Sequence, residues 1–103
     1  MDRIAKLKEF LQATPNDSFL RHALGLELLK LGNDQEAKQT FEALLADDPA
    51  YVGTYLHIGL LVQRLGEEKE ALQWFEKGMA QARKLNDKHA LSELQNAYDD
   101  LNS

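Results

Sequence analysis

Three histidines are the side chains best suited to acid–base or metal chemistry in this chain of 103 residues. An imidazole titrates near neutral pH and ligates metals, so His22, His57 and His89 are the candidates. No HxxxH or HExxH spacing joins them, and the absence of cysteine removes thiolate ligands. We therefore expect structural or solvated histidines, with no metal site and no cofactor.

Side chains that could act as nucleophiles are also few. Ser18, Ser92 and Ser103 lie outside any GxSxG motif, and the sequence has neither a P-loop nor a dinucleotide-binding glycine motif. Each serine fits a helix cap or the surface. The sequence thus predicts a protein that is not an enzyme and has no catalytic residues. A small enzyme built on His22, His57 and nearby carboxylates is the least favoured alternative.

The charge balance limits the classes of partner. With 12 basic and 17 acidic residues, the chain has a net charge of −5, which disfavours nucleic acid and anionic membranes as partners. The longest uncharged run, from Pro49 to Gln63, is too short to span a bilayer. The first residues are charged and lack the apolar run of a signal peptide, so we expect a cytoplasmic location.

The strongest pattern in the sequence is an internal repeat with a period of 34 residues. Between Gly25 and Ala46 ten positions carry the same residue as the position 34 residues later, and Pro15/Pro49 share this offset, so one supersecondary unit is used twice. The identical pairs are Gly25/Gly59, Leu26/Leu60, Leu31/Leu65, Gly32/Gly66, Glu36/Glu70, Ala37/Ala71, Gln39/Gln73, Phe41/Phe75, Glu42/Glu76 and Ala46/Ala80.

Each repeat is predicted to contain two helices, because its apolar residues recur at steps of three and four. Gly32 and Gly66 stand where the first helix of each pair would end, a position that favours glycine. Asn33 and Asp34 offer N-cap chemistry for the following helix, and Pro49 ends that helix. In the first repeat the apolar positions are Phe19, Leu20, Ala23, Leu24, Leu28 and Leu31, then Ala37, Phe41, Leu44 and Leu45.

The flanking segments predict two further helices, giving six in all. Residues 3–13 carry an apolar stripe and precede Pro15, as the second helix of a half-repeat would. Arg83 replaces the proline of the second repeat, so its last helix should run to about Leu85. The apolar stripes of the flanks are Ile4, Leu7, Phe10 and Leu11, and then Leu91, Leu94, Tyr98 and Leu101.

The period and these glycine, alanine, phenylalanine and proline positions resemble the tetratricopeptide repeat (TPR). Tyr55 occupies a position where that family prefers a large aromatic residue, whereas Arg21 departs from the pattern. The resemblance implies an all-α, right-handed α-solenoid of helix-turn-helix repeats, like that of short stand-alone bacterial TPR proteins. The expected domain is 1–103, divided into an N-terminal half-repeat (1–15), two repeats (16–49 and 50–85) and a C-terminal capping helix (86–103).

The resemblance also implies a binding surface. In TPR proteins the first helix of each repeat lines a concave groove that holds a peptide or helix of a partner. Some members grip a carboxylate there with lysine and asparagine, but His22, Leu26 and Leu60 occupy those places here. Carried onto this chain, the groove positions are Phe19, His22, Leu26, Leu29, Leu56, Leu60 and Gln63.

These residues suggest a non-catalytic protein–protein interaction module, or scaffold, with an apolar groove. The consensus core already uses Leu24, Leu28, Ile58 and Val62, which leaves the groove leucines in excess. The alternative is a homo-oligomer, such as a homodimer, that uses the same apolar surface on itself. A structural explanation is that the terminal helices cover these leucines.

Two smaller features carry structural expectations. Trp74 precedes the core residue Phe75, and we expect it to pack against the final helices near Tyr98. Asp47 and Asp48 close a helix, where the helix dipole gives a carboxylate no advantage, so we expect solvated surface.

Overall fold

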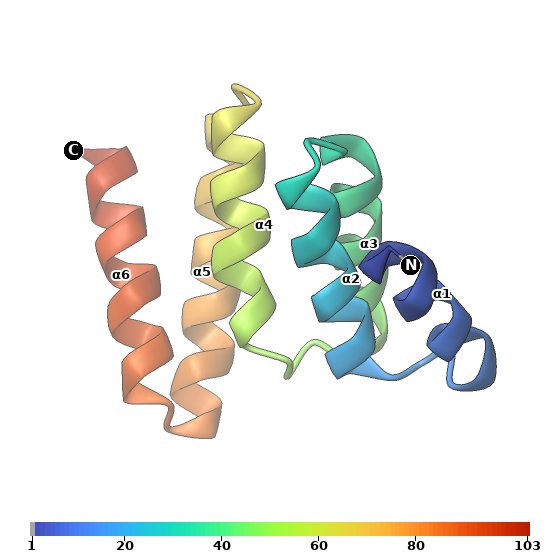
Figure 1. The fold of residues 1–103 in the computed structure, drawn as a ribbon. Coiled ribbons are helices and arrows are strands. Elements are labelled where there is room, and N and C mark those ends of the chain that lie inside the picture. Colours follow the sequence, from blue (N-terminus) through green and yellow to red (C-terminus); the bar gives the residue numbers. More distant parts are fainter. Residues whose placement is uncertain (1) are drawn as a thin grey trace. The chain divides into compact units, whose positions relative to one another are not determined.

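The computed structural model describes residues 2–103, and that part of the chain contains six helices and no strand (Figure 1). The predicted all-α class and the number of helices are confirmed. The helices are α1 (Arg3–Ala13), α2 (Ser18–Lys30), α3 (Asp34–Asp47), α4 (Gly53–Arg64), α5 (Glu68–Leu85) and α6 (Lys88–Asn102).

Two compact units divide these helices. The first extends to Asp48 and holds α1, α2 and α3, with α2 packed against both of the others. The second runs from Pro49 to Ser103 and holds α4, α5 and α6, with α5 packed against both of the others. In each unit a short loop joins consecutive helices, which therefore run in opposite directions (Figure 1).

The glycines at the repeat turns end their helices as predicted. Gly32 and Gly66 have φ angles of 80° and 90°, which residues with a Cβ atom rarely adopt. The amide of the next residue bonds back to the preceding helix, from Asn33 to Leu28 at 2.9 Å. This pattern is a Schellman motif, which satisfies carbonyl groups that the helix leaves open.

Helix starts are capped in two different ways. Asp17 accepts a hydrogen bond from the Leu20 amide at 2.9 Å. Asn33 also stands at an N-cap, but its side chain makes no capping hydrogen bond. Its amide closes the turn after α2, so the same residue ends one helix and begins the next. Asp34 and Glu36 lie in the first turn of α3, where their negative charges interact favourably with the positive end of the helix dipole.

The same glycine–phenylalanine contact lies at the centre of each unit. A Cβ atom at Gly25 would come within 2.6 Å of the Phe41 ring, and one at Gly59 would come equally close to Phe75. Only a residue without a side chain allows the paired helices to approach so closely. The buried apolar residues include Leu7, Leu24, Leu28, Phe41, Leu44 and Leu45, and then Tyr55, Ile58, Leu61, Val62, Phe75, Met79 and Leu94.

Besides Phe19, which belongs to the predicted groove, the apolar residues Phe10, Leu31 and Leu65 of the predicted helices are exposed instead. Leu31 is 66% exposed and Leu65 is exposed as well, because both are C-cap residues at which the chain turns away from its helix. Phe10 is also exposed, near the end of α1 and about one turn beyond Leu7, the buried residue of that helix.

The expectation of solvated carboxylates holds for Asp47, whose side chain is 59% exposed, whereas Asp48 is partly buried. The Ser18 hydroxyl donates to Asp48 Oδ2 at 2.6 Å, and Arg21 Nη1 lies 2.9 Å from Asp47 Oδ2. These contacts join the start of α2 to the end of α3. Arg21, the departure from the family pattern, thereby has a structural role in the first unit.

Trp74 makes contacts on α4 and on its own helix. Its ring lies against Tyr55, with 6.2 Å between the ring centres. Its Nε1 donates to Glu70 Oε2 at 3.0 Å, and the Lys77 ammonium lies 4.8 Å from the ring centre. The contacts of the tryptophan are therefore on α4 and on its own helix.

Candidate functional site

The predicted groove residues of the first unit form a stripe along α2. Phe19 is 68% exposed at the start of the helix, while His22, Leu26 and Leu29 are partly buried. Phe19 and Leu26 are seven residues apart, so they lie on the same side of α2, two turns from each other. The stripe is therefore apolar and accessible at Phe19, and less accessible further along the helix.

His22 is the predicted groove residue that turns furthest toward the interior. Its ring centre lies 6.0 Å from that of Phe41, the phenylalanine that packs on Gly25. A partly buried imidazole against a core ring agrees with the expected structural role of this histidine.

A shallow hollow of about 340 Å³ lies beside Leu26 and Leu29. Its wall combines these apolar residues of α2 with charged side chains from both α1 and α2. The full lining is Arg3, Ala23, Leu26, Glu27, Leu29 and Lys30. Two of the seven predicted groove residues thus contribute to a concave surface within the first unit.

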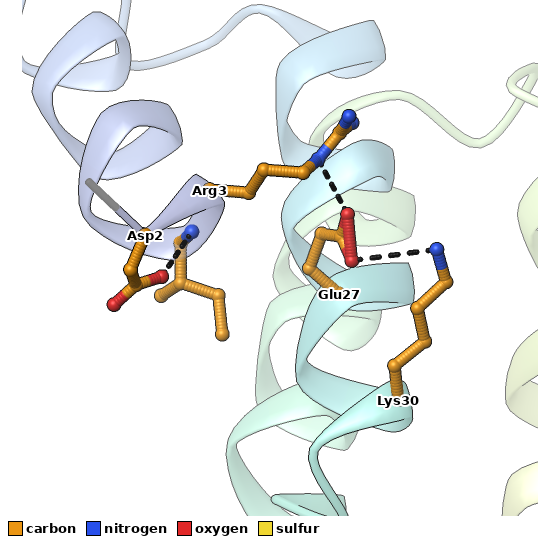
Figure 2. A network of polar contacts seen from close by, with 5 residues as sticks. Asp2, Arg3, Glu27 and Lys30 are labelled. Carbon is orange, nitrogen blue, oxygen red and sulfur yellow. Dashed lines mark hydrogen bonds and ion pairs between the residues drawn. The ribbon is translucent and has the colours of Figure 1, made fainter.

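Glu27 is the central charge of this hollow, and its side chain is only 11% exposed. Its Oε1 lies 2.5 Å from Arg3 Nε, and its Oε2 lies 3.5 Å from Lys30 Nζ. Figure 2 shows one carboxylate oxygen directed to each cation, while the terminal nitrogens of Arg3 point away from Glu27. Pairing with two cations compensates the burial of this carboxylate.

In the second unit, α4 carries the other predicted groove residues. Leu60 is 45% exposed, whereas Leu56 and Gln63 are partly buried. Leu60 is the repeat partner of Leu26, and each lies one position after the glycine that packs on a phenylalanine. The packing of that glycine turns the next residue out of the core in both repeats.

His57 is a partly buried histidine on α4, whose neighbouring charge comes from Glu93 on α6. Burial lowers the pKa of His57 below 6.5, and the negative charge of Glu93 opposes this shift. His89 is four residues before Glu93 on α6, and its Nε2 lies 3.3 Å from Glu93 Oε1. Glu93 is thus an acidic group that acts on both histidines of this unit.

Among residues 2–103, no three His, Cys, Asp or Glu side chains converge as a metal site would require. Every buried side-chain nitrogen or oxygen in that range has a hydrogen-bond partner. None of the six helices described for this range combines the length and hydrophobicity that a membrane crossing needs.

The sequence did not reveal the charged part of the hollow. Glu27 and Lys30 follow the stripe of α2 at a spacing of three, which could have indicated a polar edge to it. Arg3 gave no such signal, because its position beside Glu27 depends on how α1 packs on α2.

Comparison with known proteins places these features among related chains. A family profile described as tetratricopeptide repeat matches residues 20–51. A TPR domain protein from Salinibacter ruber, known from a crystal structure, is 41% identical with a TM-score of 0.81. That match covers 84% of this chain and 96% of the Salinibacter chain.

Two further similarities extend over most of the chain. A TPR repeat-containing protein from Pseudomonas aeruginosa is 29% identical over 91 residues, which is 88% of this chain and 87% of the relative. The TPR2B domain of yeast Sti1, solved in complex with pHsp70, is 18% identical with a TM-score of 0.88. That match covers 96% of this chain and 79% of the yeast chain, and it indicates a shared fold.

Proposed function

Because the chain belongs to the tetratricopeptide repeat family, we propose that it is a non-catalytic module that binds a peptide or helical segment of a partner protein. Proteins of this family generally mediate protein–protein interaction. The proposed binding residues lie on the outward stripe of α2 in the first unit and on the outward stripe of α4 in the second, at the positions that the family resemblance implies for an apolar concave groove. They are Phe19, His22, Leu26, Leu29, Leu56, Leu60 and Gln63.

The observation that carries this proposal is the exposure of apolar residues at those positions. Phe19 and Leu60 are exposed although each unit has a complete core elsewhere. Exposed apolar side chains on helices that already pack well through another face are typical of docking surfaces. The yeast Sti1 domain, which shares the fold and was solved with pHsp70, gives one example of a partner held by this architecture.

The chemistry of the stripe supports an apolar partner segment. Leu26 and Leu60 occupy the places where some family members carry amide or ammonium groups that hold a carboxylate. A leucine provides no hydrogen bond, so these two positions favour aliphatic or aromatic side chains of the partner. We propose that capture takes place in the cytoplasm.

The test compares capture by the natural chain with capture by the Leu26→Glu/Leu60→Glu variant. Each tagged protein is incubated with cytoplasmic extract of the source organism, and bound proteins are quantified by mass spectrometry. A partner retained by the natural chain and lost from the variant, at unchanged helical content by circular dichroism, supports the proposed surface. Equal retention by both proteins contradicts it.

A matched control separates loss of the surface from loss of apolar area in general. Leu65→Glu/Leu85→Glu introduces the same charges at two exposed leucines outside the predicted groove. We expect this control to bind like the natural chain. Light scattering over a hundredfold concentration range tests the homo-oligomer alternative, since a mass near twice 11.7 kDa would assign the surface to a second copy.

A further inference from the structure

One side of the first unit joins the charged hollow to two exposed aromatic rings. At one end, Arg3 and Lys30 flank the apolar hollow beside Leu26, and both of their side chains are largely exposed. At the other end, the rings of Phe10 and Phe19 are accessible. The positions of these residues along two antiparallel helices place them on a common side of the unit.

The side of α1 is fixed by two ion pairs. Lys8 pairs with Glu36 of α3 at 3.0 Å, whereas Arg3 pairs with Glu27 of α2, so the two cations lie on different sides of α1. Phe10 is seven residues from Arg3 and therefore shares its side of the helix.

The orientation of α2 matches that of α1. Arg3 at the start of α1 meets Glu27 near the end of α2, so the end of α1 lies beside the start of α2. Phe10 and Phe19 consequently lie at the same end of the unit. Phe10 lies seven residues from Arg3 along α1, and Phe19 lies seven residues from Leu26 along α2, a distance of about 10 Å in each case at 1.5 Å per residue.

The charge of the hollow differs in sign from that of the chain. Arg3 and Lys30 together exceed Glu27 by one positive charge, although the chain as a whole carries −5. The terminal nitrogens of Arg3 point away from Glu27, which leaves their donor direction toward the surroundings (Figure 2). A guanidinium presents donors in a geometry that suits a carboxylate.

Asp2 is the acidic group that opposes this arrangement. It lines a neighbouring hollow of about 350 Å³ together with Arg3 and Lys30. Its Oδ1 accepts a hydrogen bond from the Ile4 amide at 2.7 Å, so this carboxylate caps the start of α1. Because Asp2 is outside the lining of the hollow that contains Leu26, its charge acts from the edge.

We propose that the first unit binds a peptide segment of a partner protein in which a carboxylate side chain lies about 10 Å from a large apolar side chain. The carboxylate meets Arg3 and Lys30, and the apolar side chain packs on Phe10 and Phe19. This separation corresponds to about three residues of extended peptide or about seven residues of helix. The inference rests on the proposed function, because it defines the segment that the interaction surface recognises.

A library of random twelve-residue peptides displayed on phage, fused through their C-termini, is the probe that tests this inference. Selection on the full natural chain should enrich peptides with Asp or Glu three or seven positions from a Phe, Leu or Ile. General attraction to a protein of charge −5 would enrich basic peptides instead. An acidic preference therefore reports the local hollow, and enriched peptides without this preference overturn the inference.

Two variants of equal charge provide the control. Arg3→Gln/Lys30→Gln should abolish the preference for acidic peptides and lower the affinity for the most enriched peptide by about tenfold. This factor is the lower end of the range for a lost hydrogen bond to a charged group. Lys69→Gln/Arg83→Gln changes two exposed cations of the second unit and should leave both properties unchanged. Asp2→Asn, which keeps a capping side chain, should not lower the affinity for that peptide.

The outcomes distinguish this inference from the proposed function. If peptides without acidic residues bind the natural chain and fail to bind Leu26→Glu/Leu60→Glu, the proposed function is supported and the acidic specificity is wrong. An acidic preference that persists in Arg3→Gln/Lys30→Gln also overturns the inference. If no peptide is enriched on the natural chain relative to Leu26→Glu/Leu60→Glu, both proposals are contradicted.

Discussion

The side chain of Tyr55 on α4 lies directly over Gly78 on α5, where an added Cβ atom would come within 2.6 Å of the Tyr55 Cβ. Leu94 of α6 meets the same position at 2.9 Å, and the Tyr55 hydroxyl donates to the Pro49 carbonyl at 2.7 Å. Gly78 is therefore the point at which all three helices of the second unit meet.

The first repeat fills the corresponding space differently. The residues at the matching positions are Arg21 and Leu44, and Arg21 reaches Asp47 instead of packing a ring on the next helix. Leu44 is fully buried, so its side chain supplies the volume that Tyr55 supplies in the second repeat. The two positions differ together between the repeats because they share one volume.

Replacing Gly78 by alanine should lower the free energy of unfolding. The new methyl group would collide with a tyrosine that is buried and held by its hydroxyl, at a cost of about 1–3 kcal/mol. The higher helix propensity of alanine offsets up to about 1 kcal/mol of this steric cost. Urea denaturation followed by circular dichroism measures the difference.

Gly53→Ala is the matched control for Gly78→Ala. A Cβ atom at Gly53 would meet nothing within 4 Å, so only the gain in helix propensity acts there. We expect stability to stay constant or to rise by up to about 1 kcal/mol. Equal destabilisation by both substitutions would show that the contact of Gly78 with Tyr55 is unimportant.

The contrast between Gly59 and Gly78 explains which close contacts the sequence could predict. Gly59 was found because Gly25 repeats it, and both meet a phenylalanine that also repeats. Gly78 has Leu44 as its counterpart, so the comparison of repeats carried no information about it. Repetition reports what the two units share, and it misses what only one of them contains.

The same reasoning applies to the candidate site. The groove positions of Leu26 and Leu60 came from the resemblance to the family, and the repeat pairs the two residues, each of which comes directly after a packed glycine. The contact of Arg3 with Glu27 joins residues from different helices at a spacing that no local pattern encodes. The apolar half of the hollow was therefore predictable from sequence, whereas its charged half required the packing of α1 on α2.

Asn86 provides a test of backbone strain at the end of α5. It is the one residue other than glycine with a positive φ among residues 2–103, with φ 55° and ψ 37°. Asn86→Gly should raise the stability, and Asn86→Ala should lower it, each by about 1 kcal/mol or less. Thermal unfolding of both variants checks the opposite signs, and equal changes in one direction would contradict the assignment.

The last helix should be essential for the second unit. Leu94 is 1% exposed and closes on Gly78, so Leu94→Ala should cost about 2–5 kcal/mol through the cavity it leaves. Deleting residues 88–103 exposes the whole face of α5 that packs on α6, and we expect unfolding or aggregation. A truncated chain with an unchanged melting temperature would contradict the capping role.

The stability of the second unit should depend on pH through His57. Burial holds the pKa of folded His57 below its unfolded value of 6.5. As the pH decreases below about 6.5, the unfolded chain binds more protons at this residue than the folded chain does. The free energy of unfolding therefore decreases as the pH decreases, until the pH is below the folded pKa. His57→Gln should remove this part of the pH dependence, which urea denaturation at pH 5 to 8 measures as a difference from the natural chain.

Replacing Glu93 should change the same pH dependence in the opposite direction to replacing His57. Its negative charge raises the pKa of His57 and so opposes the effect of burial. Glu93→Gln should lower that pKa further and make the loss of stability below pH 6.5 larger than in the natural chain. His89→Gln serves as the control, because His89 is exposed at the surface of α6 and should leave the slope due to His57 in place. If the pH dependence of stability is lost in His89→Gln and kept in His57→Gln, it comes from His89 and the prediction is wrong.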